Sequence, residues 1–227
     1  MNIGGIQKTS LLDYPEKISA IVFTKGCNFR CGYCHNPELF DTQGNQELKA
    51  SDFLGFLKTR KGKLDAVVIT GGEPCLQKDL KEFIIKIKDL GFLVKLDTNG
   101  SFPEVLENIL PYIDYIAMDI KGPLEKYREI SDSQIDTEKI LKSIKLIMNS
   151  GIDHEFRTTV VKSQLAPQDF IKIAQMLKGA KRYYLQKFIP SKTLNHYFAK
   201  ENTYSENEFA IIIKTIKNYF DEIKLRG

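Results

Sequence analysis

Three cysteines of this 227-residue chain lie close together, at Cys27, Cys31 and Cys34. Thiolates bind iron and zinc, and the C-x3-C-x2-C spacing suits a compact loop that wraps one [4Fe–4S] cubane. Each cysteine then binds a different iron, which leaves the fourth iron without a protein ligand. Because an open iron can be chelated by a small molecule, the loop predicts a reactive centre as well as a metal site.

A structural zinc site and a disulfide are the alternative interpretations of this loop. Structural zinc takes four ligands, and only His35 stands nearby to complete the set. Adjacent Cys34 and His35 are poorly placed to bind one tetrahedral ion together. A disulfide would leave an odd cysteine and requires an oxidising compartment. Both interpretations are therefore weaker than the iron–sulfur one.

The composition predicts a soluble globular protein. Hydrophobic residues make up 42% of the chain and charged residues 27%. Lys and Arg number 33 against 29 Asp and Glu, and the net charge of +4 is scattered rather than gathered into a basic stripe. No apolar run approaches the roughly 20 residues that span a bilayer, and the N-terminus does not resemble a signal peptide. We therefore expect a cytoplasmic protein with reduced cysteines and with no nucleic-acid or membrane partner.

Short apolar, β-rich runs alternate with segments of helical periodicity. This alternation predicts an α/β fold whose parallel sheet is built from βα units. The six expected strands are Ser19–Thr24, Asp65–Thr70, Phe92–Asp97, Ile113–Asp119, Glu155–Val161 and Tyr183–Phe188. Six units favour a partial (β/α)6 TIM-like barrel over a closed eight-stranded one.

Two further elements are expected near the ends of the chain. Residues Ile6–Tyr14 are expected to form a short antiparallel lead-in, and a capping-box pattern predicts a final amphipathic helix over about Ser205–Leu225. No repeat or Pro/Gly/Ser-rich linker interrupts the sequence. We therefore expect one domain over residues 1–227, with a core barrel at about 17–190 and a C-terminal helical extension at about 191–227.

Polar motifs follow the ends of the next three expected strands. They are Gly71-Gly72-Glu73-Pro74, Asp97-Thr98-Asn99-Gly100 and Asp119-Ile120-Lys121. In a βα barrel these loops converge on one rim, where active sites form. Glycine turns allow close approach of a ligand, their carbonyls accept bonds from an ammonium group, and an Asp pair can bind a cation. Each motif alone also fits a turn or a helix cap, but the shared rim favours one binding site.

Other polar residues are open to both structural and functional interpretation. Arg157 lies within an expected strand, and if it faces the barrel interior it must pair with a carboxylate or a bound ligand. Gln186 stands in a similar position in the sixth strand. Cys75 is too isolated to bind a second cluster and is expected to be a free, packed thiol. His154 and His196 show no ligand spacing, so ordinary structural roles are expected.

The cysteine loop resembles the signature of the radical S-adenosylmethionine (SAM) superfamily, with Tyr33 in its aromatic position. The continuation Tyr33-Cys34-His35-Asn36 is similar to the glycyl-radical enzyme activases. Residues 4–15 resemble a subgroup that activates anaerobic ribonucleoside-triphosphate reductase, and similar stretches cover most of the chain. Glu16 departs from that subgroup, where Gly often follows the Pro. Gln186 stands close to a rim position where pyruvate formate-lyase activases carry a His, so the contacts to adenine and ribose stay open.

The resemblance implies a set of cofactors and a reaction. It implies a [4Fe–4S] cluster on Cys27, Cys31 and Cys34, with SAM chelated at the open iron and cleaved by one electron to methionine and a 5′-deoxyadenosyl radical. The residues it implies in cofactor binding are Tyr33, Gly71, Gly72, Glu73, Asp97, Thr98, Asp119, Lys121 and Arg157. A monovalent cation beside SAM is a further candidate. No catalytic side chain is implied beyond the ligands of the cluster and of SAM.

The substrate implied by the resemblance is a backbone glycine of a partner glycyl-radical enzyme. In the subgroup above this partner is anaerobic ribonucleoside-triphosphate reductase, and a flavodoxin or ferredoxin is the expected type of electron donor. The four cysteines of the sequence offer no ligands for an auxiliary cluster. Two alternatives remain open, namely a small-molecule radical SAM enzyme resembling 7-carboxy-7-deazaguanine synthase and a non-catalytic metal-binding interaction module.

Overall fold

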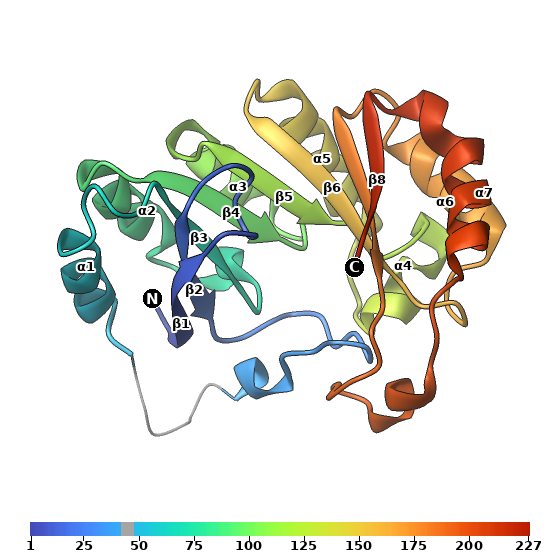
Figure 1. The fold of residues 1–227 in the computed structure, drawn as a ribbon, viewed down its shortest axis with the longest axis horizontal. Helices are drawn as coiled ribbons and strands as arrows, with labels where there is room; N and C mark the ends of the chain where they lie inside the picture. Colours follow the sequence, from blue (N-terminus) through green and yellow to red (C-terminus); the bar gives the residue numbers. More distant parts are fainter. Residues whose placement is uncertain (42–47) are drawn as a thin grey trace.

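The computed structural model describes residues 1–41 and 48–227. They contain a curved eight-stranded sheet in which the strands follow one another in chain order (Figure 1). The strands are β1 (Ile3–Ser10), β2 (Ser19–Thr24), β3 (Ala66–Gly71), β4 (Leu93–Thr98), β5 (Tyr115–Asp119), β6 (Asp153–Val160), β7 (Arg182–Lys187) and β8 (Glu222–Arg226). β1 is antiparallel to β2, and each later strand is parallel to its predecessor. The expected α/β partial TIM-like barrel is confirmed.

Helices cover the outer face of the sheet (Figure 1). They are α1 (Ala50–Lys58), α2 (Leu80–Asp89), α3 (Pro103–Ile109), α4 (Leu124–Ser131), α5 (Thr137–Asn149), α6 (Pro167–Met176) and α7 (Glu206–Ile216). Strand residues alternate between two faces, so Val67 and Ile69 join the main core under the helices. Ala66 and Val68 pack with Tyr115 in a smaller cluster on the inner face. Within the described residues, we find no helix with the length and apolar character to cross a membrane.

The end of the chain differs from the predicted long helix. Ser205 caps α7 in a capping box with Glu208, as expected, but the helix ends at Ile216 rather than near Leu225. A short 3-10 turn follows, and β8 (Glu222–Arg226) then pairs with β7. The described sheet therefore has seven parallel strands instead of six. The antiparallel lead-in is confirmed, although it forms at Ile3–Ser10, slightly before the predicted position.

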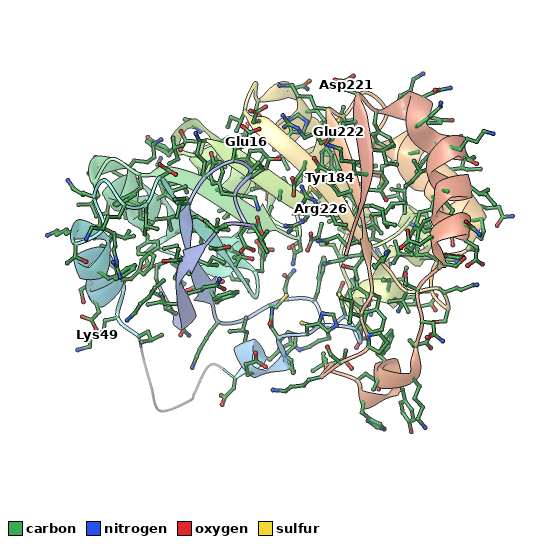
Figure 2. All side chains as sticks on the ribbon, viewed as in Figure 1. Glu16, Lys49, Tyr184, Asp221, Glu222 and Arg226 are labelled. Atoms are coloured by element: carbon green, nitrogen blue, oxygen red, sulfur yellow. The ribbon has the colours of Figure 1, made fainter. Side chains whose placement is uncertain are left out.

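The loop between β1 and β2 packs across the end of the barrel at which the parallel strands begin. The Tyr14 ring is buried with its centroid 5.7 Å from that of Tyr115, and Lys95 Nζ donates to the Asp13 carbonyl oxygen at 2.7 Å. The same loop carries Glu16, which is labelled in Figure 2. Its φ of 60° lies in the left-handed region. Only glycine adopts this conformation without steric cost, which explains why glycine suits this position.

Glu16→Gly is expected to stabilise the protein by about 0.5–1 kcal/mol, because it removes the left-handed strain at this residue. Urea unfolding of the two proteins measures the difference. The neighbouring residue Lys17 is outside the left-handed region, so Lys17→Gly should destabilise the loop instead. Equal effects of the two substitutions would show that the backbone at Glu16 is not strained.

Candidate active site

The cysteine loop connects β2 to a short 3-10 helix, η1 (Pro37–Phe40). Its three cysteines are free, with Cys31 buried and Cys27 and Cys34 half-buried. Burial raises the pKa of Cys27 to about 11 and also raises the pKa of Cys31. Because metals bind the thiolate, assembly of a cluster on this loop must release these protons.

One cavity of about 240 Å³ opens beside all three cysteines. The predicted site residues that line it are Cys27, Cys31, Tyr33, Cys34, Gly71, Gly72, Asp97, Thr98, Asp119, Lys121 and Arg157. Glu73 is the one predicted site residue that does not line it. A larger groove of about 620 Å³ lies between α3 and α5, but its lining contains no cysteine. The residues expected on one rim therefore share one cavity.

The arrangement of the possible metal ligands bears on the zinc alternative. Among residues 1–41 and 48–227, no three His, Cys, Asp or Glu side chains converge closely enough to hold a single metal ion. A structural zinc site requires such convergence. The described part of the cysteine loop therefore presents no preformed site for a single ion.

The glycine turn after β3 packs directly against the start of the cysteine loop. The Gly72 N–H donates to the Thr24 carbonyl oxygen at 2.9 Å, and the Glu73 N–H donates to the Gly26 carbonyl oxygen at 2.8 Å. A Cβ atom on Gly72 would lie 1.9 Å from that Gly26 oxygen. The absence of a side chain at Gly72 therefore lets the turn hold the cysteine loop at backbone contact distance.

Gly72→Ala is expected to lower the free energy of unfolding by about 3 kcal/mol and to lower iron incorporation, because the turn and the loop must separate. Urea unfolding of the apoprotein and iron analysis after reconstitution measure both effects. Gly55→Ala in α1 is the matched control, since a Cβ there meets nothing within 4 Å. It should stabilise the helix by about 1 kcal/mol. Equal behaviour of the two variants would show that the contact with the loop is unimportant.

Glu73 lies beneath the cavity, fully buried. Its carboxylate accepts hydrogen bonds from the Cys75 N–H at 2.9 Å, the Thr98 hydroxyl at 2.8 Å and the Asn99 N–H at 2.7 Å. Burial raises the pKa of Glu73, and these bonds act in the opposite direction. The structure therefore places Glu73 where it ties the end of β3 to the end of β4, behind the groups that face the cavity.

Ion pairs connect the charged residues of the cavity. Arg157 Nη1 lies 3.1 Å from Asp97 Oδ2, and its Nε lies 2.9 Å from Asp119 Oδ1. Lys121 Nζ lies 3.2 Å from Asp119 Oδ2. Although burial opposes ionisation, Arg157 and Lys121 lower the pKa of Asp119 to about 2, and Arg157 and Lys95 lower the pKa of Asp97. The interior Arg157 thus pairs with carboxylates, as expected, and these pairs favour the ionised form of both.

Lys95 and Glu155 belong to the same network but carry no motif that identifies them. Lys95 Nζ is almost fully buried, 2.8 Å from Asp97 Oδ1. Glu155 is 1% exposed and accepts a hydrogen bond from the Tyr115 hydroxyl at 2.8 Å. Each stands two residues before a site residue and so shares its strand face, which is the one sequence signal that points to them.

The segment after β7 braces the cysteine loop, a contact that the sequence does not predict. The Asn195 N–H donates to the Gly32 carbonyl oxygen at 2.9 Å. The Phe198 ring packs on Gly32, where a Cβ atom would come within 2.4 Å of it. The same ring makes an edge contact with Tyr33, at a centroid distance of 6.2 Å. Aromatic packing therefore fixes the loop that carries the cysteines.

The other residues considered from the sequence lie outside the cavity lining. Cys75 is free and buried, with its Sγ 3.7 Å from the Thr98 hydroxyl, which confirms a packed thiol. Gln186 pairs in register with Arg226 of β8 and does not line the cavity. His154 is buried in β6 and His196 is exposed, and neither lines the cavity.

Comparison with known proteins places the chain in a family. The model of the radical SAM superfamily matches residues 21–177. A protein of Methanocaldococcus jannaschii described as a candidate glycyl-radical enzyme activating enzyme is 38% identical, over 99% of this chain and 95% of its own length. The pyruvate formate-lyase-activating enzyme of Clostridium pasteurianum is 30% identical, over 85% of this chain and 82% of that enzyme.

A solved structure shares the fold at low identity. Streptococcus suis SuiB bound to its precursor peptide SuiA superposes with a TM-score of 0.70 at 16% identity, over 91% of this chain. The match covers 48% of that protein, so this chain spans about half its length. The superfamily match and the relatives that extend over nearly the whole chain agree with the cysteine loop and its cavity. The chain belongs to the radical SAM superfamily, whose members use a [4Fe–4S] cluster and SAM, and glycyl-radical enzyme activating enzymes are among its relatives.

Proposed function

We propose that this protein activates a glycyl-radical enzyme by taking a hydrogen atom from a backbone glycine of that partner. The observation that carries the proposal is the single cavity that joins the three cysteines to the glycine turn, the two aspartates and the two cations. The relative that is similar over nearly the full chain supports the same activity. In this proposal residues 1–227 act as one radical SAM domain in the cytoplasm.

The residues of the cavity fit both cofactors. Cys27, Cys31 and Cys34 would ligate three irons and leave one open for SAM. When bound, the cluster supplies one electron to the SAM sulfonium, which breaks the S–C5′ bond to give methionine and a 5′-deoxyadenosyl radical. The protein's own task is to hold SAM in one orientation and to keep water and stray hydrogen donors away.

The charges of the cavity complement the amino-acid end of SAM. The carbonyls of Gly71 and Gly72, which line the cavity, would accept bonds from its ammonium group. Lys121 and Arg157 would hold its carboxylate, and Asp119 keeps the pKa of Lys121 well above the ordinary value although burial opposes this. Both cations therefore stay charged. Asp97 and Asp119 would orient them, while Thr98 and Tyr33 complete the wall of the site.

The partner that we propose is anaerobic ribonucleoside-triphosphate reductase, with a flavodoxin or ferredoxin as electron donor. The Cα–H of glycine is a favourable target because the two flanking amides stabilise the product radical. The glycine Cα–H bond would break, its hydrogen atom would end on 5′-deoxyadenosine, and the unpaired electron would remain on the glycine Cα.

The test is anaerobic incubation of the reconstituted, reduced protein with SAM and a purified glycyl-radical enzyme. A glycine-centred radical should appear by electron paramagnetic resonance, and deuterium from Cα-deuterated partner glycine should enter 5′-deoxyadenosine. The matched control is the same partner with its radical glycine replaced by alanine. A radical on pyruvate formate-lyase but not on the reductase would change the partner and keep the activity. SAM cleavage that depends on a metabolite and gives no protein radical would support the small-molecule alternative.

A further inference from the structure

Charged side chains continue from the cavity across the inner face of the barrel. Beyond Arg157, the next carboxylate is that of Glu155 on β6, and the next cation is Arg226 on β8. Arg226 Nη1 and Nη2 donate to Glu155 Oε1 and Oε2 at 2.7 and 2.9 Å. This parallel pair of bonds is the strongest arrangement between a guanidinium and a carboxylate. Arg226 lies outside the cavity lining.

Glu155 stands between two arginines. It is 1% exposed, so its charge requires a partner inside the protein. Arg157 Nη1 is 4.0 Å from Glu155 Oε1, the limit of an ion pair, whereas the same Nη1 is 3.1 Å from Asp97. Arg157 therefore faces Asp97 and Asp119, while Arg226 satisfies Glu155. At this depth a charge that loses its partner attracts the next cation strongly.

The position of Arg226 is itself fixed by β8. Its backbone pairs in register with Gln186 of β7, and its guanidinium carbon lies 3.5 Å from the centroid of the Tyr184 ring. The Tyr184 hydroxyl bonds to Glu222 on the same strand as Arg226, and Figure 2 shows Tyr184, Glu222 and Arg226 together beside β8. Although burial alone would lower it, the contacts with Glu155 raise the pKa of Arg226.

We propose that Arg226 is a positioning residue for the SAM site. By engaging Glu155 it keeps the Arg157 guanidinium directed toward Asp97 and Asp119, where Arg157 would hold the SAM carboxylate. Without Arg226, the buried Glu155 carboxylate draws Arg157 Nη1 away from Asp97, and the SAM carboxylate loses an aligned partner. This inference rests on the proposed function of the cavity.

The test compares SAM dissociation constants of three variants and the wild type after anaerobic reconstitution, with iron content and circular dichroism as checks on the cluster and the fold. Arg226→Gln should keep its iron but bind SAM about tenfold more weakly. In Arg226→Gln/Glu155→Gln the buried charge is gone, and affinity should return to within about threefold of the wild type. Arg182→Gln is the matched control, because Arg182 lies on β7 and pairs with exposed Asp153 at 3.5 Å. It should not change the affinity.

Rescue by Glu155→Gln assigns the defect to the unpaired Glu155 carboxylate, and iron content and circular dichroism that stay unchanged in Arg226→Gln separate positioning from a merely structural role. Unchanged affinity in Arg226→Gln, or a double variant as weak as the single one, overturns the inference. If Arg226→Gln does not fold, Arg226→Met replaces it under the same criteria, since methionine also removes the charge but keeps a long, unbranched side chain. A wild-type protein that binds no SAM overturns the proposed function and this inference together, whereas wild-type binding with an insensitive Arg226 removes this inference alone.

Discussion

Cys31→Ala is expected to abolish reductive SAM cleavage, with a fall in rate of more than about a thousandfold. Cys31 is the most buried of the three loop cysteines, and each of them would ligate a different iron. Loss of one ligand exposes a second iron and removes the site-differentiated cluster that SAM requires. Iron analysis and quantification of 5′-deoxyadenosine after reduction measure the two consequences together.

Cys75→Ala is the matched control for this prediction. Cys75 is also buried and free, but it lies beside Thr98 and does not line the cavity. It should keep its iron and its SAM cleavage and should lose only about 1 kcal/mol of stability. Cleavage retained by Cys31→Ala would remove this residue from the ligand set, and iron lost equally from both variants would mean that the effect is one of folding.

The sequence predicts the barrel strands because each is a short apolar run, and polar motifs mark the carboxyl ends of the first four. β2 forms over Ser19–Thr24 as predicted. β8 is missed for a specific reason. Ile216, Phe220 and Ile223 continue the helical spacing of α7, although the chain leaves the helix after Ile216. Only the pairing with β7, a contact between distant segments, decides that Glu222–Arg226 is extended.

The same distinction applies to the candidate site: local sequence patterns predict some of its residues, and contacts between distant segments decide the others. The cysteine spacing and the strand-end motifs are local, and among the predicted site residues all but Glu73 line the cavity. The position of Glu73 depends on bonds from Thr98 and Asn99, more than twenty positions away, so its local motif does not show that it lies outside the cavity lining. The partnership of Glu155 with Arg226 is equally remote. Ion pairs between such distant residues can be identified only from the folded structure.

Arg157→Gln is expected to lower the free energy of unfolding of the apoprotein by about 3 kcal/mol near neutral pH, because it leaves two carboxylates without their shared guanidinium. The loss lies at the lower end of the range for buried ion pairs, since Lys95 still contacts Asp97 and Lys121 still contacts Asp119. SAM binding should weaken in the same variant. Arg182→Gln, whose partner Asp153 is exposed, should cost less than about 1 kcal/mol.

The pH dependence of the Arg157→Gln deficit tests its electrostatic origin. In the wild type, the pKa of Asp119 falls from 3.8 to about 2. A carboxyl with a lowered pKa stabilises the fold above its ordinary pKa, and this stabilisation is lost as the pH falls through the folded-state value. The deficit should therefore be largest above about pH 4 and should shrink between about pH 4 and pH 2, because over this interval the folded variant binds more protons at Asp119 than the folded wild type does. A deficit that stays constant over this interval would assign the role of Arg157 to packing rather than to charge.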